Sequence, residues 1–278
     1  MTQGCLIFAY NGQIDYGSQA VLAARFVKKH LDIPTCLVTD DTTIKSLSVD
    51  PATVFEYVIV QDIESDNTRM LYNGPDEKKL IDFKNVNRSS AYDLTPWDRT
   101  LLIDSDFFVF SDRLLQYLNA DRDFMICPAM KDICAERHSG PVLLNSASIE
   151  MVWATNIIFN KTSEVKIIFD LVDHIKSNWE YYGALYKFDT RRFRNDFAFS
   201  IACHIMSGYG LDKCYTKLPA PMWSTDQDKL VKVSSDGNLV FLVPHKEGRV
   251  IRSKGQDLHM MNKQDILDNI NQLTELAQ

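Results

Sequence analysis

The strongest constraint on the fold is a set of short segments that are mostly apolar and show no regular alternation of apolar and polar residues. Three of them near the N-terminus are residues 6–9, 34–39 and 55–60. Between the first two, residues 16–30 carry apolar side chains at the spacing of a helix that buries one face. Continuously apolar strands separated by a helix are typical of a parallel sheet covered on both faces. We therefore expect an α/β fold with a mixed, mostly parallel, Rossmann-like sheet flanked by helices.

The same patterns continue along the chain. They predict strands at residues 100–103, 124–128, 152–160 and 239–243, and helices at residues 163–179, 193–206 and 263–276. Residues 64–95 are polar and predict loops with helical pieces, and residues 131–148 predict a long loop. No linker rich in Gly, Ser or Pro interrupts the pattern, so one domain over residues 1–278 is expected.

Composition narrows the class of protein. No apolar run is long enough to cross a bilayer, and the N-terminus lacks the basic region of a signal peptide. The six cysteines form no CxxC pair, which favours reduced, buried thiols and a cytoplasmic location (the host cytoplasm for a viral protein). The formal net charge of −7 disfavours a large nucleic-acid footprint, although residues 191–194 contain three arginines.

Three Asp-x-Asp pairs occur in a chain with 28 aspartates, so the motif alone has little weight. Asp104-Ser105-Asp106 differs from the other two because an apolar segment precedes it and another follows it. Two carboxylates in such a stretch cost several kcal/mol if they are left without a partner. A divalent cation such as Mn²⁺ or Mg²⁺ offsets that cost, since it prefers oxygen ligands. This pair is therefore the candidate metal and phosphate site.

The segment around this pair resembles the Asp-x-Asp segment of GT-A glycosyltransferases, especially the retaining glycogenin and galactosyltransferase-like family. Other positions resemble the same family in the same order: Ala9-Tyr10-Asn11 with Tyr16 resembles its uridine-binding strand and loop, Arg88 its donor-binding arginine, and His259 the histidine that completes its metal site. The chain is also similar to GT-A glycosyltransferases of T4-type bacteriophages.

The resemblance implies one GT-A domain with a nucleotide-binding half at 1–110 and an acceptor-binding half at 111–278. It implies a metal-dependent transfer of a sugar from a nucleoside-diphosphate sugar, a UDP-sugar by default, to a hydroxyl acceptor. The implied metal ligands are Asp104, Asp106 and His259, for Mn²⁺ or Mg²⁺. The implied nucleotide-sugar contacts are Ala9, Tyr10, Asn11, Tyr16, Asp40, Arg88, Asp104, Ser105 and Lys263. The implied catalytic residues are Asp196 and Asn195, and the implied acceptor contacts are Trp153, Thr155 and Asn156.

Several alternatives stay open at this stage. Asp196 is also suited to cap the helix that follows it, Trp153 to pack in the core, His259 to lie in a surface loop, and Lys79 to be a solvated charge rather than a phosphate contact. The acceptor expected first is a hydroxymethylated base of phage DNA, and a saccharide or protein hydroxyl is the alternative. Whether the transfer retains or inverts the anomeric configuration, and how many copies of the chain assemble, are also open.

Other functional classes lack their motifs. A sugar-nucleotide pyrophosphorylase needs a glycine-rich loop after the first strand, and the loop here is Tyr10-Asn11-Gly12-Gln13. The GxGxxG motif of dinucleotide-binding dehydrogenases and the GxxxxGK[ST] motif of P-loop enzymes are both absent from the sequence. A non-catalytic protein that binds a nucleotide sugar remains the alternative.

Overall fold

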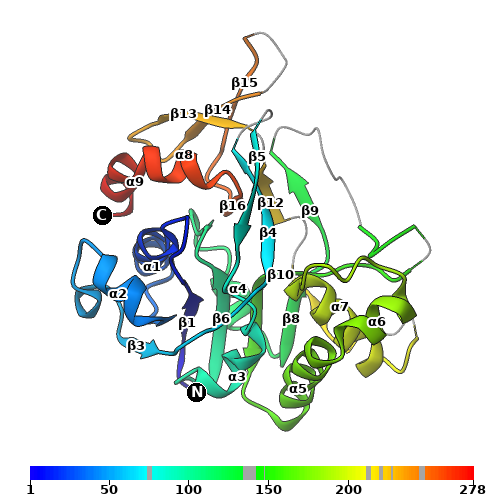
Figure 1. The fold of residues 1–278 in the computed structure, drawn as a ribbon. Coiled ribbons are helices and arrows are strands. Elements are labelled where there is room, and N and C mark those ends of the chain that lie inside the picture. The colour runs from blue at the N-terminus through cyan, green and yellow to red at the C-terminus, as the bar shows by residue number, and fades with distance from the viewer. Residues whose placement is uncertain are drawn as a thin grey trace.

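A seven-stranded sheet forms the centre of the protein (Figure 1). The computed structural model describes residues 1–73, 77–133, 142–146, 148–210, 214–218, 222–226, 228–243 and 248–278. The strand order in the sheet is β11 (Thr216–Lys217), β8 (Phe124–Cys127), β10 (Trp153–Asn160), β6 (Arg99–Asp104), β1 (Gln3–Phe8), β2 (Thr35–Thr39) and β3 (Tyr57–Val60).

The sheet is mixed and mostly parallel, as the sequence predicts. Strands β6, β1, β2 and β3 all run parallel, and β10 alone is antiparallel to both of its neighbours, β6 and β8. The register pairs Phe8 at the end of β1 with Asp104 at the end of β6. The carboxyl ends of the two strands therefore lie side by side, which is where open parallel sheets bind ligands.

Helices flank this sheet. Helix α1 (Tyr16–Leu31) packs against β1 and β2, and Asp15 begins it by accepting a hydrogen bond from the backbone N–H of Ser18. Helix α7 (Asn195–Met206) packs against β10, and α5 (Ser163–Ser177) packs against α7. The remaining helices are α2 (Asp41–Ser46), α3 (Ala91–Leu94), α4 (Leu115–Leu118), α6 (Trp179–Tyr186), α8 (Lys263–Asp268) and α9 (Ile270–Ala277). None of the helices in the described part of the chain combines the length and the apolar character needed to cross a lipid bilayer.

Three smaller sheets complete the fold. One has the order β7 (Phe107–Phe108), β16 (Leu258–Met260), β12 (Met222–Thr225) and β9 (Met130–Asp132). Its β7 follows directly on the aspartate pair, so the pairing of β7 with β16 brings the C-terminal segment to the end of β6. The others are β13 (Lys229–Val233), β14 (Leu239–Leu242) and β15 (Val250–Arg252), and the hairpin β4 (Thr68–Asn73) and β5 (Glu77–Asp82).

Three of the predicted segments differ in the structure. The described part of residues 64–95 contains the β4–β5 hairpin in addition to the predicted short helical pieces. The predicted helix at 263–276 is two helices that meet at Asn269. The predicted loop at 131–148 begins within β9, and its residues 134–141 and 147 lie outside the described residues. The polar residues of the β4–β5 hairpin and the shortness of β9 leave too weak a periodic signal for these strands to be found from the sequence.

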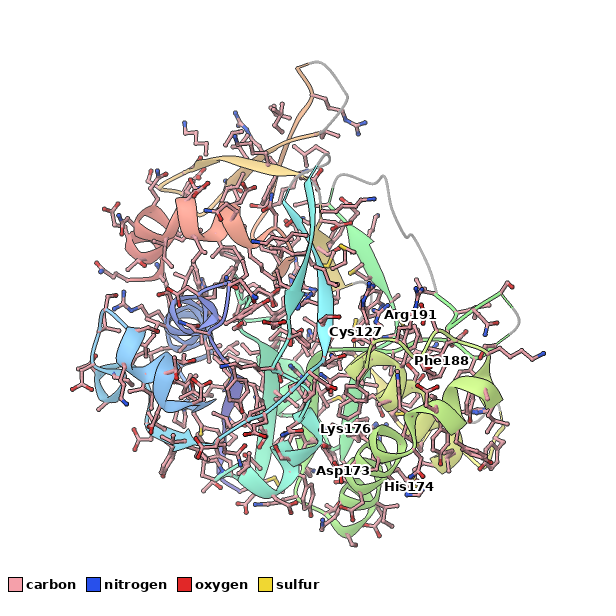
Figure 2. The ribbon with its side chains drawn as sticks, viewed as in Figure 1. Cys127, Asp173, His174, Lys176, Phe188 and Arg191 are labelled. Atoms are coloured by element: carbon pink, nitrogen blue, oxygen red, sulfur yellow. The ribbon has the colours of Figure 1, made fainter. Side chains whose placement is uncertain are left out.

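A single set of contacting apolar side chains extends from Cys5 to Ala277 and includes the inner faces of the central strands. Figure 2 shows how densely side chains fill the space between the ribbons. Cys5, Cys36 and Cys127 are buried thiols within this core, as expected, and Cys134 lies outside the described residues. The division of the chain into a nucleotide half and an acceptor half remains a prediction.

Asp265 on α8 makes the C-terminal part of this core sensitive to pH. Its carboxylate is 5% exposed and accepts a hydrogen bond from the backbone N–H of Leu230 on β13. Burial raises its pKa to about 6, with nearby Asp228 and Asp268 acting in the same direction and Lys229 against it. The folded state therefore binds a proton that the unfolded state, with an aspartate pKa of about 3.9, has already lost.

Because the pKa of Asp265 is higher in the folded state, its ionisation lowers the free energy of unfolding as the pH rises from about 4 to about 6. In Asp265→Asn this contribution is absent. We expect the unfolding free energy of Asp265→Asn, relative to the native protein, to increase by about 2 kcal/mol between pH 4 and pH 7. Urea unfolding of both proteins at several pH values measures this difference, and parallel pH curves would contradict it.

Candidate functional site

The two aspartates lie where β6 ends and the chain turns into β7. Asp104 is the last residue of β6, and Ser105 and Asp106 form the turn that follows. The backbone N–H of Met260 donates to the carbonyl of Asp106 over 2.9 Å, which holds this turn against β16. The apolar residues on either side fix the two strands in the core, so the carboxylates between them have a fixed position.

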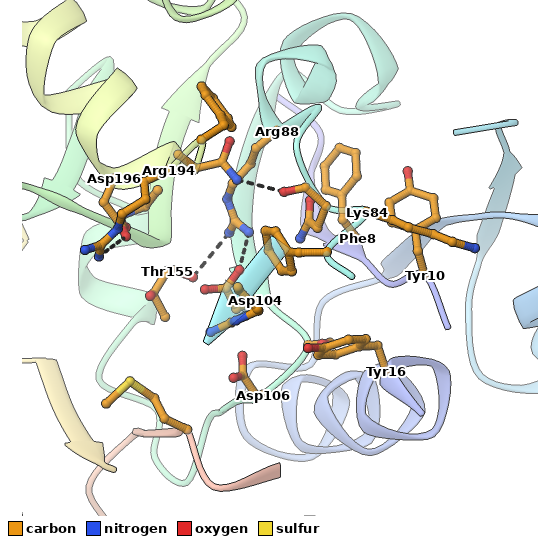
Figure 3. A pocket seen from close by; sticks show the side chains of 18 of the residues that line it. Phe8, Tyr10, Tyr16, Lys84, Arg88, Asp104, Asp106, Thr155, Arg194 and Asp196 are labelled. Atoms are coloured by element: carbon orange, nitrogen blue, oxygen red, sulfur yellow. Dashed lines mark hydrogen bonds and ion pairs between the residues drawn. The ribbon is translucent and has the colours of Figure 1, made fainter. Parts of the chain in front are cut away.

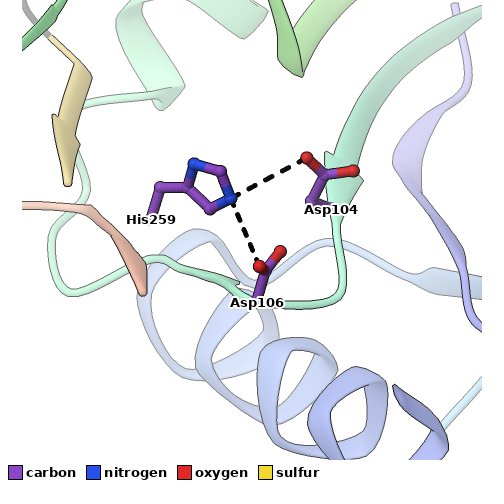
Figure 4. Close-up of side chains that lie close together, drawn as sticks. All are labelled: Asp104, Asp106 and His259. Atoms are coloured by element: carbon purple, nitrogen blue, oxygen red, sulfur yellow. Dashed lines mark ion pairs between the residues drawn. The ribbon is translucent and has the colours of Figure 1, made fainter. Parts of the chain in front are cut away.

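Asp104, Asp106 and His259 form a cluster in which each residue offers one ligand atom, all within 4.8 Å of one another (Figure 4). The His259 Nε2 atom lies 3.2 Å from Asp106 Oδ2 and 4.0 Å from Asp104 Oδ2. Adjacent ligands of an octahedral divalent ion lie about 3 Å apart, because its bonds are about 2.1 Å long. The spacing of the three side chains therefore fits one divalent cation.

The protonation of His259 also fits a metal ligand. Burial lowers the pKa of its imidazole to about 4, with Asp104 acting against this shift. The ring is therefore neutral near pH 7, and its Nδ1 atom lies 3.5 Å from the Thr155 hydroxyl. A neutral imidazole beside two carboxylates is a ligand set that suits Mn²⁺. The alternative of a surface-loop histidine is wrong, because His259 is 6% exposed and lies within β16.

Two buried cations accompany the carboxylates. Arg88 is 1% exposed, forms an ion pair with Asp104 and donates to the Thr155 carbonyl over 3.3 Å. Lys263 is fully buried, pairs with Asp106 and donates to the Met260 carbonyl over 3.3 Å. Burial lowers the pKa of Lys263 well below its usual value, and Asp104 acts in the opposite direction. Each carboxylate of the pair thus has its own cation.

A cavity of about 400 Å³ opens over this cluster (Figure 3). Tyr10 and Lys84 lie on one side of Asp104, and Asp196 and Arg194 lie on the other. Twelve of the residues predicted from the sequence line it: Ala9, Tyr10, Tyr16, Arg88, Asp104, Ser105, Asp106, Trp153, Thr155, Asn195, Asp196 and His259. The fold therefore brings the predicted nucleotide, metal, catalytic and acceptor groups to one cavity.

The charge of the cavity is opposite in sign to that of the whole chain. Its lining contains five cationic side chains, Arg69, Lys84, Arg88, Arg192 and Arg194, and three carboxylates, Asp104, Asp106 and Asp196. The chain as a whole carries a formal charge of −7. Cations concentrated in a cleft of an acidic protein favour an anionic ligand, and a phosphate group pairs well with arginine.

The cavity wall also holds buried polar atoms that have no hydrogen-bond partner among the described residues. Among them are Tyr10 Oη, Asn85 Oδ1, Arg88 Nε, Trp153 Nε1 and Asn195 Oδ1. Buried polar groups are nearly always hydrogen-bonded. Several unpartnered polar atoms in one cavity therefore indicate that it binds water or a polar ligand. Their mixture of donors and acceptors suits a ligand rich in hydroxyl and carbonyl groups.

Asn195 and Asp196 lie in the first turn of α7. In Figure 3, Asp196 lies on the side of the cavity opposite Tyr10. One Asp196 oxygen accepts from the backbone N–H of Ala154 over 2.9 Å, and the other pairs with Arg194 over 3.1 Å. The alternative that Asp196 caps this helix is wrong, since the helix begins at Asn195 and Arg194 takes the N-cap position. The Asn195 side-chain amide donates to the Asn85 carbonyl over 2.9 Å.

Four predicted residues do not line the cavity. Asn11 bonds to Asp15, Ser46 and Gly17, and so ties the start of α1 to α2. Asp40 begins α2 by accepting from the Thr43 N–H, and pairs with Lys84 over 2.9 Å. The others are Asn156, buried in β10, and Lys263, which reaches the cavity only through Asp106. Their roles as ligand contacts remain predictions.

The sequence did not single out several residues of the cavity, chiefly Arg69, Phe83, Lys84 and Asn85. They belong to the segment predicted as polar loop, and nothing in its local pattern distinguishes Lys84 from Lys79. The structure distinguishes the two lysines, because Lys84 lines the cavity whereas Lys79 is exposed on β5 and does not. In the predicted basic cluster, Arg192 and Arg194 line the cavity, whereas Arg191 pairs with Asp189 on the surface (Figure 2).

No protein-family model matches this chain, and no curated protein matches its sequence. Solved structures similar to it include the apo form of the glycosyltransferase GlyE of Streptococcus pneumoniae TIGR4, at 14% identity over 79% of this chain with a TM-score of 0.43. The galactosyltransferase LgtC with donor and acceptor sugar analogs is 14% identical over 70% of this chain and 68% of its own, with a TM-score of 0.42. Mouse xyloside xylosyltransferase 1 is 10% identical over 78% of this chain and 85% of its own, with a TM-score of 0.46.

The match spans 46% of the GlyE chain, so less than half of that protein has a counterpart here. What this chain does therefore depends on the chemistry of its own cavity.

Proposed function

We propose that this protein is a GT-A glycosyltransferase that transfers a sugar from a nucleoside-diphosphate sugar, a UDP-sugar by default, with the help of Mn²⁺ or Mg²⁺. The observation that carries the proposal is the cluster of Asp104, Asp106 and His259 at the end of β6, inside a cavity whose other charges are mainly cationic. A site of this kind suits a ligand that contains both a cation-binding diphosphate and a polar, uncharged part.

The donor is held along the cavity in an order that the side chains suggest. Tyr10, Tyr16 and Lys84 line the end near β1 and suit the nucleoside, since they offer two aromatic rings and a hydrogen-bond donor. Asp104, Asp106 and His259 lie next along it and would hold the metal ion that binds the diphosphate. When bound, the ion acts as a Lewis acid and stabilises the charge of the leaving diphosphate.

The transfer takes place at the end lined by Asn195 and Asp196. An acceptor hydroxyl oxygen forms a bond to the anomeric carbon, and the bond from that carbon to the diphosphate oxygen breaks with its electron pair. The hydroxyl proton passes to the departing diphosphate. Asp196 stabilises the positive charge that develops on the sugar, as carboxylates do in glycoside hydrolysis. Its hydrogen bond to Ala154 N–H and its ion pair with Arg194 hold it in place.

The acceptor that we propose is a hydroxymethylated base of phage DNA, extruded from the duplex as such chemistry requires. Trp153 and Phe193 in the cavity wall offer aromatic surface for a base, and Arg192 and Arg194 offer charge for the adjoining phosphates. Phosphate contacts of this kind weaken steeply with salt. An uncharged saccharide acceptor, by contrast, is bound with little dependence on ionic strength.

A donor panel with defined acceptors tests the whole proposal. The protein is incubated with UDP-, GDP- and ADP-sugars and with Mn²⁺, Mg²⁺ or EDTA, and the products are analysed by intact mass. We expect metal-dependent transfer from one class of donor, and transfer to hydroxymethylated DNA but not to unmodified DNA. Transfer only to saccharides or proteins would overturn the DNA acceptor alone. Binding of a nucleotide sugar without transfer or hydrolysis would instead indicate a non-catalytic protein.

A further inference from the structure

Arg69 reaches the cavity from an element that the rest of the site does not use. It lies on β4, which pairs with β5 and with no other strand among the described residues (Figure 1). In this hairpin Arg69 is opposite Ile81, which is buried and anchors the ribbon, whereas Leu80 beside it is exposed. Arg69 and its neighbours Thr68 and Met70 line the cavity, so one edge of the hairpin forms part of its wall.

The guanidinium of Arg69 is held toward the metal end of this cavity. Its central carbon lies 4.8 Å from the centre of the Phe83 ring, which is close enough for a cation–π contact. Burial raises the pKa of Tyr16, and Arg69 lowers it in turn. Burial likewise lowers the pKa values of His259 and Lys263, and Arg69 lowers them further. Arg69 is therefore close enough to Tyr16, His259 and Lys263 for its positive charge to act on all three.

Arg69 differs from three of the four other cations of the cavity in that it forms no ion pair with a carboxylate among the described residues. Lys84 pairs with Asp40, Arg88 with Asp104, and Arg194 with Asp196. Arg192 lies near Asp189 and, after Arg191, contributes to the lowered pKa of that carboxyl. Among the described residues, no carboxylate lies within ion-pair distance of Arg69. A half-buried guanidinium with an aromatic support and no counter-ion is well placed to bind an anion that enters the cavity.

We propose that Arg69 binds the phosphate groups of the ligand directly, and that this contact ties the β4–β5 hairpin to the occupied site. The inference rests on the proposed function in that the ligand is taken to be a nucleoside diphosphate. A planar guanidinium can donate two parallel hydrogen bonds to phosphate, and the contact with Phe83 limits the rotamer freedom that it loses on binding. Bound phosphate would then stabilise the position of strands β4 and β5 beside the cavity.

The test compares the binding of inorganic pyrophosphate and of uridine, both with Mn²⁺, to the native protein and to Arg69→Gln, by calorimetry. We expect Arg69→Gln to bind pyrophosphate about 10- to 100-fold more weakly and uridine unchanged, because only the former carries phosphate. Arg69→Lys keeps the charge but not the paired N–H donors of the guanidinium. Its affinity for pyrophosphate should therefore lie between those of the native protein and Arg69→Gln. Lys79→Gln is the matched control: it removes the same charge from the same hairpin, outside the cavity, and should bind pyrophosphate like the native protein.

Hydrogen exchange of residues 68–73 and 77–82 gives a second readout. Pyrophosphate should slow their exchange in the native protein and in Lys79→Gln, but not in Arg69→Gln. Unchanged pyrophosphate affinity in Arg69→Gln, or an equal loss in Lys79→Gln, would overturn the inference. The proposed function fails separately, if the native protein binds pyrophosphate through Arg69 and yet neither transfers nor hydrolyses any nucleotide sugar.

Discussion

Asp104→Asn combined with Asp106→Asn is expected to abolish sugar transfer, with kcat/KM lower by at least about a thousandfold. In the proposed reaction, an ion held by these carboxylates would supply several kcal/mol of stabilisation to the leaving diphosphate, and each 1.4 kcal/mol is about a tenfold change in rate. The same double substitution should remove high-affinity Mn²⁺ binding, because it takes away both charged ligands of the cluster and leaves only the neutral His259. Initial rates and Mn²⁺ titrations followed by electron paramagnetic resonance measure both effects.

The chain provides a matched control for this experiment. Asp121 and Asp123 form the same Asp-x-Asp pair on the exposed surface, so their replacement by asparagine should change neither rate nor metal affinity. The substitution at the cluster also leaves Arg88 and Lys263 buried without their carboxylates, which lowers stability. His259→Gln avoids this difficulty, because it removes a ligand without changing the charge. Native rates and native Mn²⁺ affinity in the folded variants would disprove the metal site.

Asp196→Asn is expected to lower kcat by about 100- to 1000-fold while the affinity for the donor changes little. The amide keeps an oxygen that can accept from Ala154 N–H, so the backbone around it stays in place. The variant loses the negative charge that opposes the positive charge developing on the sugar, which matters in the transition state and much less in the bound donor. Steady-state kinetics with a separate measurement of the donor dissociation constant distinguish the two quantities.

Asp189→Asn serves as the control for this position. Asp189 belongs to the same basic segment and pairs with Arg191, but it does not line the cavity. Its substitution should leave kcat within about twofold of the native value. If Asp196→Asn instead weakens donor binding and lowers kcat/KM with kcat unchanged, Asp196 only positions the donor and the role in the transition state is wrong.

The sequence predicts the parallel half of the sheet because its strands are short, mostly apolar and separated by a helix with clear spacing. It also predicts the aspartate pair, since two carboxylates between buried strands need a physical reason. His259 is different: nothing local marks it, and its place beside Asp106 depends on the pairing of β16 with β7. Its prediction came from a resemblance, and its geometry comes only from the folded chain.

The positions of Arg69 and Lys84 in the cavity could not be predicted from the sequence. Both lie in a polar segment in which several cations have the same local surroundings in the sequence. Arg69 reaches the cavity because β4 and β5 pair with Arg69 opposite Ile81, and that register is set by the burial of one side chain. Such a register is a property of the tertiary structure, because a shift of one residue would turn every side chain to the other face.

Strand β10 contacts functional side chains at both ends of the cavity. The backbone N–H of Ala154 holds Asp196, and the carbonyl of the next residue, Thr155, holds Arg88 and through it Asp104. A substitution that shifts the backbone of β10 at Ala154 or Thr155 is therefore expected to displace Asp196 and Arg88 together. The two ends of the cavity would then change jointly rather than one at a time.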